Sequence, residues 1–95
     1  MKLLTVVPSK RPGKKFDAVF ETDTGRTKRV SFGQAGAPDF TKTGDEERKR
    51  LYLIRHAANE NWDKPDTPGA LSRWLLWNKP TLEESVRDFR KRFKI

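Results

Sequence analysis

The stretch from residue 15 to residue 33, KFDAVFETDTGRTKRVSFG, decides the fold. Between its two halves, residues 22–25 (TDTG) are typical of a tight turn in which glycine supplies a positive φ. On either side of that turn, apolar residues recur at every second position, as they do in a β-strand with one buried face: Phe16, Ala18 and Phe20, then Val30 and Phe32. We therefore predict a β-hairpin over residues 15–33.

The residues before this hairpin predict one more strand and a loop. Residues 3–7 alternate as a strand requires, and Pro8, Pro12 and Gly13 then interrupt the pattern. A two-stranded hairpin is marginally stable at best in water, so its aromatic face needs a cover. We expect the first strand and the helices that follow to supply that cover.

A loop and then a charged helix are predicted after the hairpin. Glycine and proline punctuate residues 34–44, which indicates an irregular segment. Residues 43–46 (TGDE) have the capping-box pattern of a helix start. From residue 45 to about residue 58 the helix carries only a narrow apolar stripe: Leu51, Ile54 and Ala58.

Two shorter helices are predicted in the last third of the chain. Thr67 before Pro68 is typical of a helix start, and Pro80 ends that segment near Trp77. Residues 81–84 (TLEE) form a second capping box. Beyond it, apolar residues recur at steps of four, three and four, which predicts a helix over residues 82–93: Leu82, Val86, Phe89 and Phe93.

Together these elements predict an α+β fold in a single domain, residues 1–95, since a chain of this length supports one core. We expect strands and a basic loop over residues 1–33, a loop over residues 34–44, and about three helices over residues 45–95. The sheet would be antiparallel, with two or three strands packed against the helices. The predicted core contains twelve side chains: Phe16, Phe20, Val30, Phe32, Leu51, Ile54, Leu71, Trp74, Leu75, Val86, Phe89 and Phe93.

The composition excludes several classes of protein. The chain has no cysteine and one histidine, which excludes disulfides, thiolate nucleophiles and thiolate-bound zinc and leaves little for any metal site. No Walker loop or GxGxxG motif occurs, so we expect no cofactor. The longest apolar run is four or five residues, and the opening MKLLTVV is too short for a signal peptide. We therefore expect neither membrane insertion nor secretion.

The charge of the chain points to an anionic partner. Lysine and arginine number 21 against 13 acidic residues, a formal net charge of +8. The excess lies at the two ends, +5 over residues 1–33 and +4 over residues 67–95, whereas residues 34–66 carry −1. Basic clusters of this kind are the usual footprint of phosphate binding, although they also serve as solvated surface. The candidate phosphate contacts are Lys10, Arg11, Lys14, Lys15, Arg26, Arg29, Arg87, Arg90 and Lys91.

The tryptophans have two readings. Exposed aromatic rings among bases can stack on unpaired nucleobases, so Trp62, Trp74 and Trp77 are candidates for that role. Trp74 lies on the apolar side of its helix and Trp77 lies beside the Pro80 turn, which favours packing in the core or at an interface. Trp62 is expected to fasten its polar loop onto the helices.

One pattern resembles an enzyme site. Pro38-Asp39 followed by Glu47 and Lys49 has the residue order of a metal-dependent nuclease, in which two carboxylates hold Mg²⁺ and lysine assists the attacking water. In such a site the glutamate and lysine share one face of a strand. Here they fall two residues apart on a predicted helix and diverge around it. We therefore expect no enzyme activity and name no catalytic or metal-binding residues.

The chain also resembles a known group of viral proteins. The likeness is carried by residues 31–33 (SFG), 39–42 (DFTK), 45–50 (DEERKR), 55–56 (RH) and above all 75–82 (LLWNKPTL). In these stretches the chain is similar to a family of small uncharacterised basic proteins of large DNA viruses of algae and other protists. The resemblance runs from about Lys15 to Phe93. It implies a viral protein, and it brings no catalytic residues because the family has no established activity.

Charge and resemblance together predict a non-enzymatic basic viral protein that binds nucleic acid through phosphate contacts, with weak sequence preference. Its place would be the cytoplasm or nucleus of the host cell during infection, or the interior of the virion. The alternative is a structural or minor capsid protein that acts through contacts with other virion proteins. Salt would separate the two, because phosphate binding weakens steeply with salt whereas an apolar interface does not.

Overall fold

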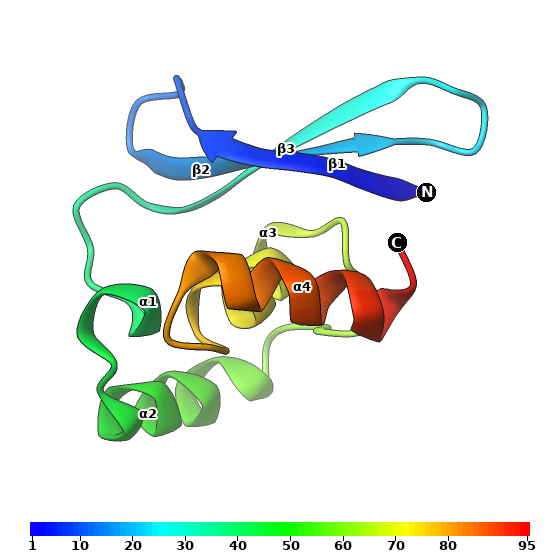
Figure 1. Ribbon diagram of the computed structural model, residues 1–95. Coiled ribbons are helices and arrows are strands. Elements are labelled where there is room, and N and C mark those ends of the chain that lie inside the picture. Colours follow the sequence, from blue (N-terminus) through cyan, green and yellow to red (C-terminus); the bar gives the residue numbers. More distant parts are fainter.

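The computed structural model describes residues 1–95, and its first third is an antiparallel sheet with strand order β1-β2-β3 (Figure 1). The strands are β1 (Lys2–Pro8), β2 (Lys14–Glu21) and β3 (Thr27–Gln34). Phe16 lies opposite Phe32, and Phe20 lies between Leu3 on β1 and Lys28 on β3. The apolar residues at every second position therefore share one face of the sheet.

The predicted hairpin is confirmed, together with the chemistry of its turn. Gly25 has a φ of 81°, the left-handed conformation that glycine adopts at no steric cost. Its N–H donates to the Thr22 carbonyl at 2.9 Å, and the Thr22 N–H donates to the Arg26 carbonyl at 2.7 Å. The turn closes the pair of strands where the sequence places glycine.

The helices lie against one face of the sheet, which confirms the α+β fold (Figure 1). The final helix has the predicted bounds. None of the helices has the length and apolar composition needed to cross a membrane. In chain order the helical elements are α1 (Phe40–Thr43), α2 (Glu46–Ala57), α3 (Pro68–Leu71), the π-helical turn η1 (Ser72–Leu76) and α4 (Leu82–Phe93).

The prediction that residues 34–44 form a loop is wrong in its second half, where the helical turn α1 forms. Asp39 caps this turn by accepting a hydrogen bond from the Thr41 N–H at 2.9 Å. Gly44 ends it with a left-handed φ of 62° and donates its N–H to the Phe40 carbonyl. Phe40 is buried and anchors the turn. A helix of four residues is too short to show a periodicity in the sequence.

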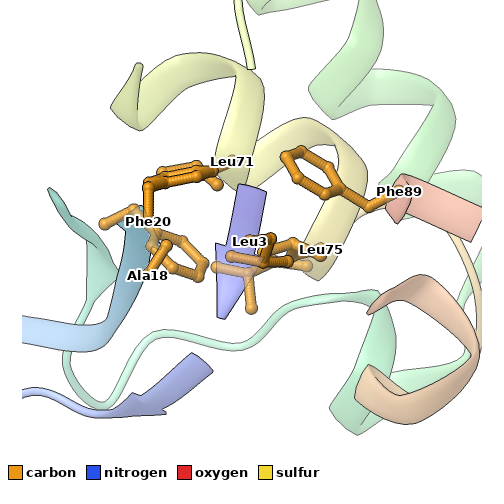
Figure 2. Close-up of a cluster of buried hydrophobic side chains, with 8 residues drawn as sticks. Leu3, Ala18, Phe20, Leu71, Leu75 and Phe89 are labelled. Atoms are coloured by element: carbon orange, nitrogen blue, oxygen red, sulfur yellow. The ribbon is translucent and has the colours of Figure 1, made fainter. Parts of the chain in front are cut away.

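The core lies between the sheet and α3, η1 and α4 (Figure 2). Five of the predicted core residues are fully buried, and five more are partly buried against them. The central cluster consists of Leu3, Ala18, Phe20, Phe32, Leu71, Leu75, Leu76 and Phe89. The partly buried members of the prediction are Phe16, Val30, Trp74, Val86 and Phe93.

The prediction is wrong for the apolar stripe of α2. Leu51 is 37% exposed and Ile54 is 61% exposed, and α2 has no buried residue. The helix contacts the rest of the molecule through a different side, on which Tyr52 stacks against Trp77 and the Lys49 ammonium donates to the Asn78 carbonyl at 2.8 Å. A stripe of apolar residues indicates an amphipathic helix, but it does not reveal whether another element covers the stripe.

Replacing Phe89 with alanine should lower the free energy of unfolding by about 3 to 5 kcal/mol, because a fully buried ring is lost from the centre of the core. Ile54→Ala is the matched control and should change it by less than about 1 kcal/mol, since most of that side chain is exposed. Urea unfolding of both variants measures the difference. Equal losses would contradict the packing described here.

Candidate nucleic-acid interface

The nine basic residues predicted from the sequence do not form one surface. The β1–β2 turn, with Lys10 and Arg11, lies at the opposite end of the sheet from the β2–β3 turn, with Arg26 (Figure 1). The two turns are joined by β2 and are therefore separated by the length of that strand. Arg26 therefore does not join the other candidates.

The charge of Arg29 is compensated within the sheet. Its Nη1 atom lies 3.0 Å from Oδ2 of Asp17, which is buried. Ser31 Oγ donates to the other carboxylate oxygen at 2.6 Å. The hydrogen bonds from Ser31 and Ser9, together with the Arg29 guanidinium, hold the pKa of Asp17 below its usual range despite burial. The Arg29 guanidinium thus neutralises a buried carboxylate of the sheet and is not a free cation.

Lys15 is also committed to the fold, contrary to the sequence prediction. Its ammonium pairs with Oδ2 of Asp39 and donates to the Ala37 carbonyl at 2.6 Å. The two side chains are 8% and 2% exposed, so this ion pair is almost fully buried. The partner lies 24 positions along the chain, beyond the reach of any local pattern. Lys15 joins β2 to the start of α1 and is not available to a phosphate.

Helix α4 brings its basic residues alongside β1. Nη2 of Arg90 lies 3.3 Å from the carbonyl oxygens of both Leu3 and Leu4, so Arg90 covers part of the free edge of the sheet. Arg87 and Arg90 line a shallow groove of about 470 Å³ between α4 and β1. Beyond the end of the same strand, the chain turns through Lys10 and Arg11.

Six of the nine predicted residues remain as a candidate surface that follows β1, its turn and α4. All six are exposed to solvent, and only Arg87 has a carboxylate within ion-pair distance, Glu83 at 3.5 Å. This β1–α4 surface consists of Lys10, Arg11, Lys14, Arg87, Arg90 and Lys91.

A second feature, not predicted from the sequence, is a stack of three rings. The Tyr52 ring lies 4.5 Å from Trp77 at an interplanar angle of 7°, and 4.2 Å from His56 at 24°. Tyr52 and His56 are four residues apart on one side of α2, which a sequence can reveal, but Trp77 comes from beyond η1. We call Trp77, Tyr52 and His56 the aromatic ladder. Trp77 is half-buried here, as its predicted packing role requires.

Two hollows open on the aromatic ladder, and both are lined by all three rings. The first, of about 370 Å³, lies between the end of the sheet, the segment before α1, and α2 and α3, and Lys14 is among its walls. The second, of about 320 Å³, runs along α2 and adds Arg48, Leu51 and Arg55. Burial raises the pKa of the Tyr52 hydroxyl well above its usual range, so that hydroxyl is neutral at physiological pH.

The other two tryptophans hold the fold together. The guanidinium groups of Arg73 and Arg92 lie over the Trp74 ring, 4.2 and 3.8 Å from its centroid. The Trp74 indole N–H donates to the Trp62 carbonyl at 2.8 Å, and Arg73 also contacts the Trp62 ring. These contacts fasten the loop of Trp62 onto the helices, as predicted.

The residues of the nuclease-like pattern have separate partners. Asp39 pairs with Lys15, Glu47 accepts from Arg50 Nε at 3.1 Å, and Lys49 donates to a backbone carbonyl. No group of three or more histidine, aspartate or glutamate side chains is placed to hold a metal ion. Asp39, Glu47 and Lys49 are thus each engaged with a different part of the chain.

Comparison with known proteins places the chain in a family. Residues 4–56 match DUF5754, a family of unknown function. The chain belongs to this family. The matched region spans most of β1, the other two strands, α1 and nearly all of α2, so it contains the Lys15–Asp39 pair and two of the three rings of the aromatic ladder. No curated protein and no solved structure matches the chain.

In this DUF5754 protein, Lys15→Met should lower the free energy of unfolding by about 3 to 5 kcal/mol, because it leaves the Asp39 carboxylate buried without its counter-ion. Arg50→Met is the control: it breaks an ion pair with Glu47 that is mostly exposed, and should cost less than about 1 kcal/mol. Denaturant unfolding measures both. A loss for Lys15→Met no larger than the control would show that the buried pair does not stabilise the fold.

The lowered pKa of Asp17 predicts that this protein loses stability in acid. The pKa of this carboxyl is lower in the folded chain than the unfolded value of about 3.9, so its stabilising contribution is complete above about pH 4 and is lost as the pH falls through the folded value. The stability difference between wild type and Asp17→Asn should therefore shrink from pH 5 to pH 2. Asp63→Asn, at an exposed aspartate without an ion pair, is the control and should show no such trend. A constant difference for Asp17→Asn would contradict the assignment.

Proposed function

We propose that the protein binds nucleic acid through phosphate contacts made by the β1–α4 surface. The observation that carries this proposal is that five of the six basic side chains of this surface have no carboxylate partner, whereas Lys15 and Arg29 have one. Cations without internal partners are free to displace the counter-ions of a phosphate backbone. These five side chains are therefore available to a ligand, whereas Lys15 and Arg29 are engaged within the fold.

The chemistry of the surface favours contacts to the backbone over the reading of sequence. Lysine and arginine side chains on a turn and on an exposed helix face act chiefly as positive charges for phosphates, which position a protein without specifying a sequence. None of the six is an asparagine or glutamine, the residues that pair with adenine edges. Weak sequence preference is the expected consequence, and no catalytic step or cofactor is part of the proposal.

The viral setting belongs to the same proposal. It rests on the resemblance carried by residues 75–82, which include Trp77 of the aromatic ladder and the turn before α4. A nucleic-acid-binding protein of this kind would act in the cytoplasm or nucleus of the infected cell, or inside the virion.

Fluorescence anisotropy with labelled duplexes at several salt concentrations tests the binding mode. If four to five phosphates are contacted at once, log K should fall with log salt at a slope of about −4. The triple variant Arg11→Ala, Arg87→Ala, Lys91→Ala should flatten that slope by up to about 3 units on every sequence alike. Arg90 is kept, since it bonds the carbonyls of β1.

The control for this experiment removes the same charge elsewhere. Arg26, Lys42 and Lys64 are exposed and outside the β1–α4 surface, and none of them forms an ion pair. Their combined replacement by alanine should leave the slope nearly unchanged. An equal effect of both triple variants would show that only net charge matters. No binding at low salt by the folded protein would contradict the proposal.

A second candidate, a structural or minor capsid protein, is favoured by the exposed Leu51 and Ile54 on α2. Exposed apolar side chains of this size are typical of contacts with another protein. The salt series separates this candidate from the first, because association through apolar contacts persists at high salt. Loss of all duplex binding together with salt-resistant association with virion proteins would favour it.

A further inference from the structure

The outer ring of the aromatic ladder is open to a ligand. Tyr52 covers one face of the His56 ring, and Nδ1 of His56 lies 3.5 Å from the Glu60 carboxylate. The His56 side chain is nevertheless 44% exposed. Because Tyr52 covers one face of the ring, a ligand would reach His56 at the opposite face or at its edge. A further flat ring placed there would extend a ladder whose planes are already nearly parallel.

Basic side chains lie on both sides of this position. In the groove along α2, Arg55 has no carboxylate partner, and the partner of Arg48 is the exposed Asp45 at 3.7 Å. The hollow on the other side includes Lys14, which also has no carboxylate partner and belongs to the β1–α4 surface. The groove along α2 therefore favours an anionic ligand. In the larger hollow, the Lys15 charge is paired with Asp39, and Lys14 is the unpaired cation opposite Glu60.

Unused hydrogen-bonding groups line the larger hollow. Tyr52, Ser72 and Gln34 are among its lining residues, and the hydroxyls and the amide of these side chains form no hydrogen bond within the protein. At about 370 Å³, this hollow has the size of a typical small-molecule site. Its combination of a flat aromatic wall, polar groups and a lysine suits a planar heterocycle that carries a phosphate.

We propose that the aromatic ladder binds one unpaired nucleobase of a single-stranded nucleic acid. The base stacks on the free face of His56, its edge meets the polar groups of the larger hollow, and the flanking phosphates lie near Lys14 and Arg55. The inference rests on the proposed function for its phosphate contacts and adds the requirement for an unpaired base. A base inside a duplex is covered by its neighbours on both faces and cannot stack here.

The test compares two labelled oligonucleotides with the same phosphates and different bases. One is a ten-residue oligothymidylate, and the other is the same strand with abasic residues, both measured by anisotropy against the full-length protein at one salt concentration. The abasic strand should bind roughly 5- to 150-fold more weakly, the range expected when one stacked base is lost. The corresponding ribose strands form a second arm, and the arm with the larger ratio identifies the natural ligand as DNA or RNA.

Variants at His56 separate stacking from structure and charge. His56→Ala should abolish the difference between thymidylate and abasic strands, whereas His56→Phe, which keeps a flat ring, should retain it. Circular dichroism is expected to show both variants folded, because the side chain is partly exposed. Arg55→Ala should weaken binding of both strands alike, since it removes a phosphate contact and not the stacking surface.

Each outcome has a distinct meaning. Equal binding of the thymidylate and abasic strands by the wild-type protein would overturn the nucleobase site and leave the proposed phosphate binding intact. Loss of the base preference in His56→Phe as well as in His56→Ala would also overturn it. Failure of the folded protein to bind any strand or duplex at low salt would instead overturn the proposed function itself.

Discussion

The buried ion pair between Lys15 and Asp39 is the contact on which the arrangement of the molecule depends. It joins the start of β2 to the cap of α1, at the point where the chain leaves the sheet. Strand β3 also packs tightly at this corner. At Gly33, which has a φ of 78°, an added Cβ atom would lie 2.9 Å from Leu76 Cδ1 and 3.1 Å from Lys15 Cβ, so the position has no room for a side chain. Removing one partner of such a pair leaves an unpaired charge in the interior, so the geometry of this corner is strongly constrained.

That corner sets where the functional side chains lie. Because α1 is fixed to the sheet, α2 begins at a defined position and carries Tyr52 and His56 against Trp77. The buried pair also divides the lysines at positions 14 and 15 between two roles: Lys15 supports the fold, whereas the neighbouring Lys14 lines the hollow beside the aromatic ladder. Lys14 therefore belongs both to the β1–α4 surface and to the walls of the hollow beside the aromatic ladder.

Local patterns in the sequence were sufficient for the hairpin and for α4, since each depends on neighbours two, three or four positions away. They failed where the deciding partner is remote. Lys15 has the sequence context of a surface cation, because its partner Asp39 is 24 positions away. Ile54 lies on the apolar stripe of an amphipathic helix, which predicts burial, but no other element covers that stripe. Tyr52 and Trp77 come from separate helical segments, so only the folded chain brings the aromatic ladder together.

The most direct test of the account is an amide chemical-shift map of the ¹⁵N-labelled protein during titration with oligothymidylate. We predict that the largest shifts fall in three places: the β1–β2 turn at residues 10–14, the exposed side of α4 at residues 87–91, and the second half of α2 around His56. Residues 22–26, at the far end of the sheet, should not move. Shifts concentrated at residues 22–26 and on β3, with the turn and both helices unaffected, would contradict the account.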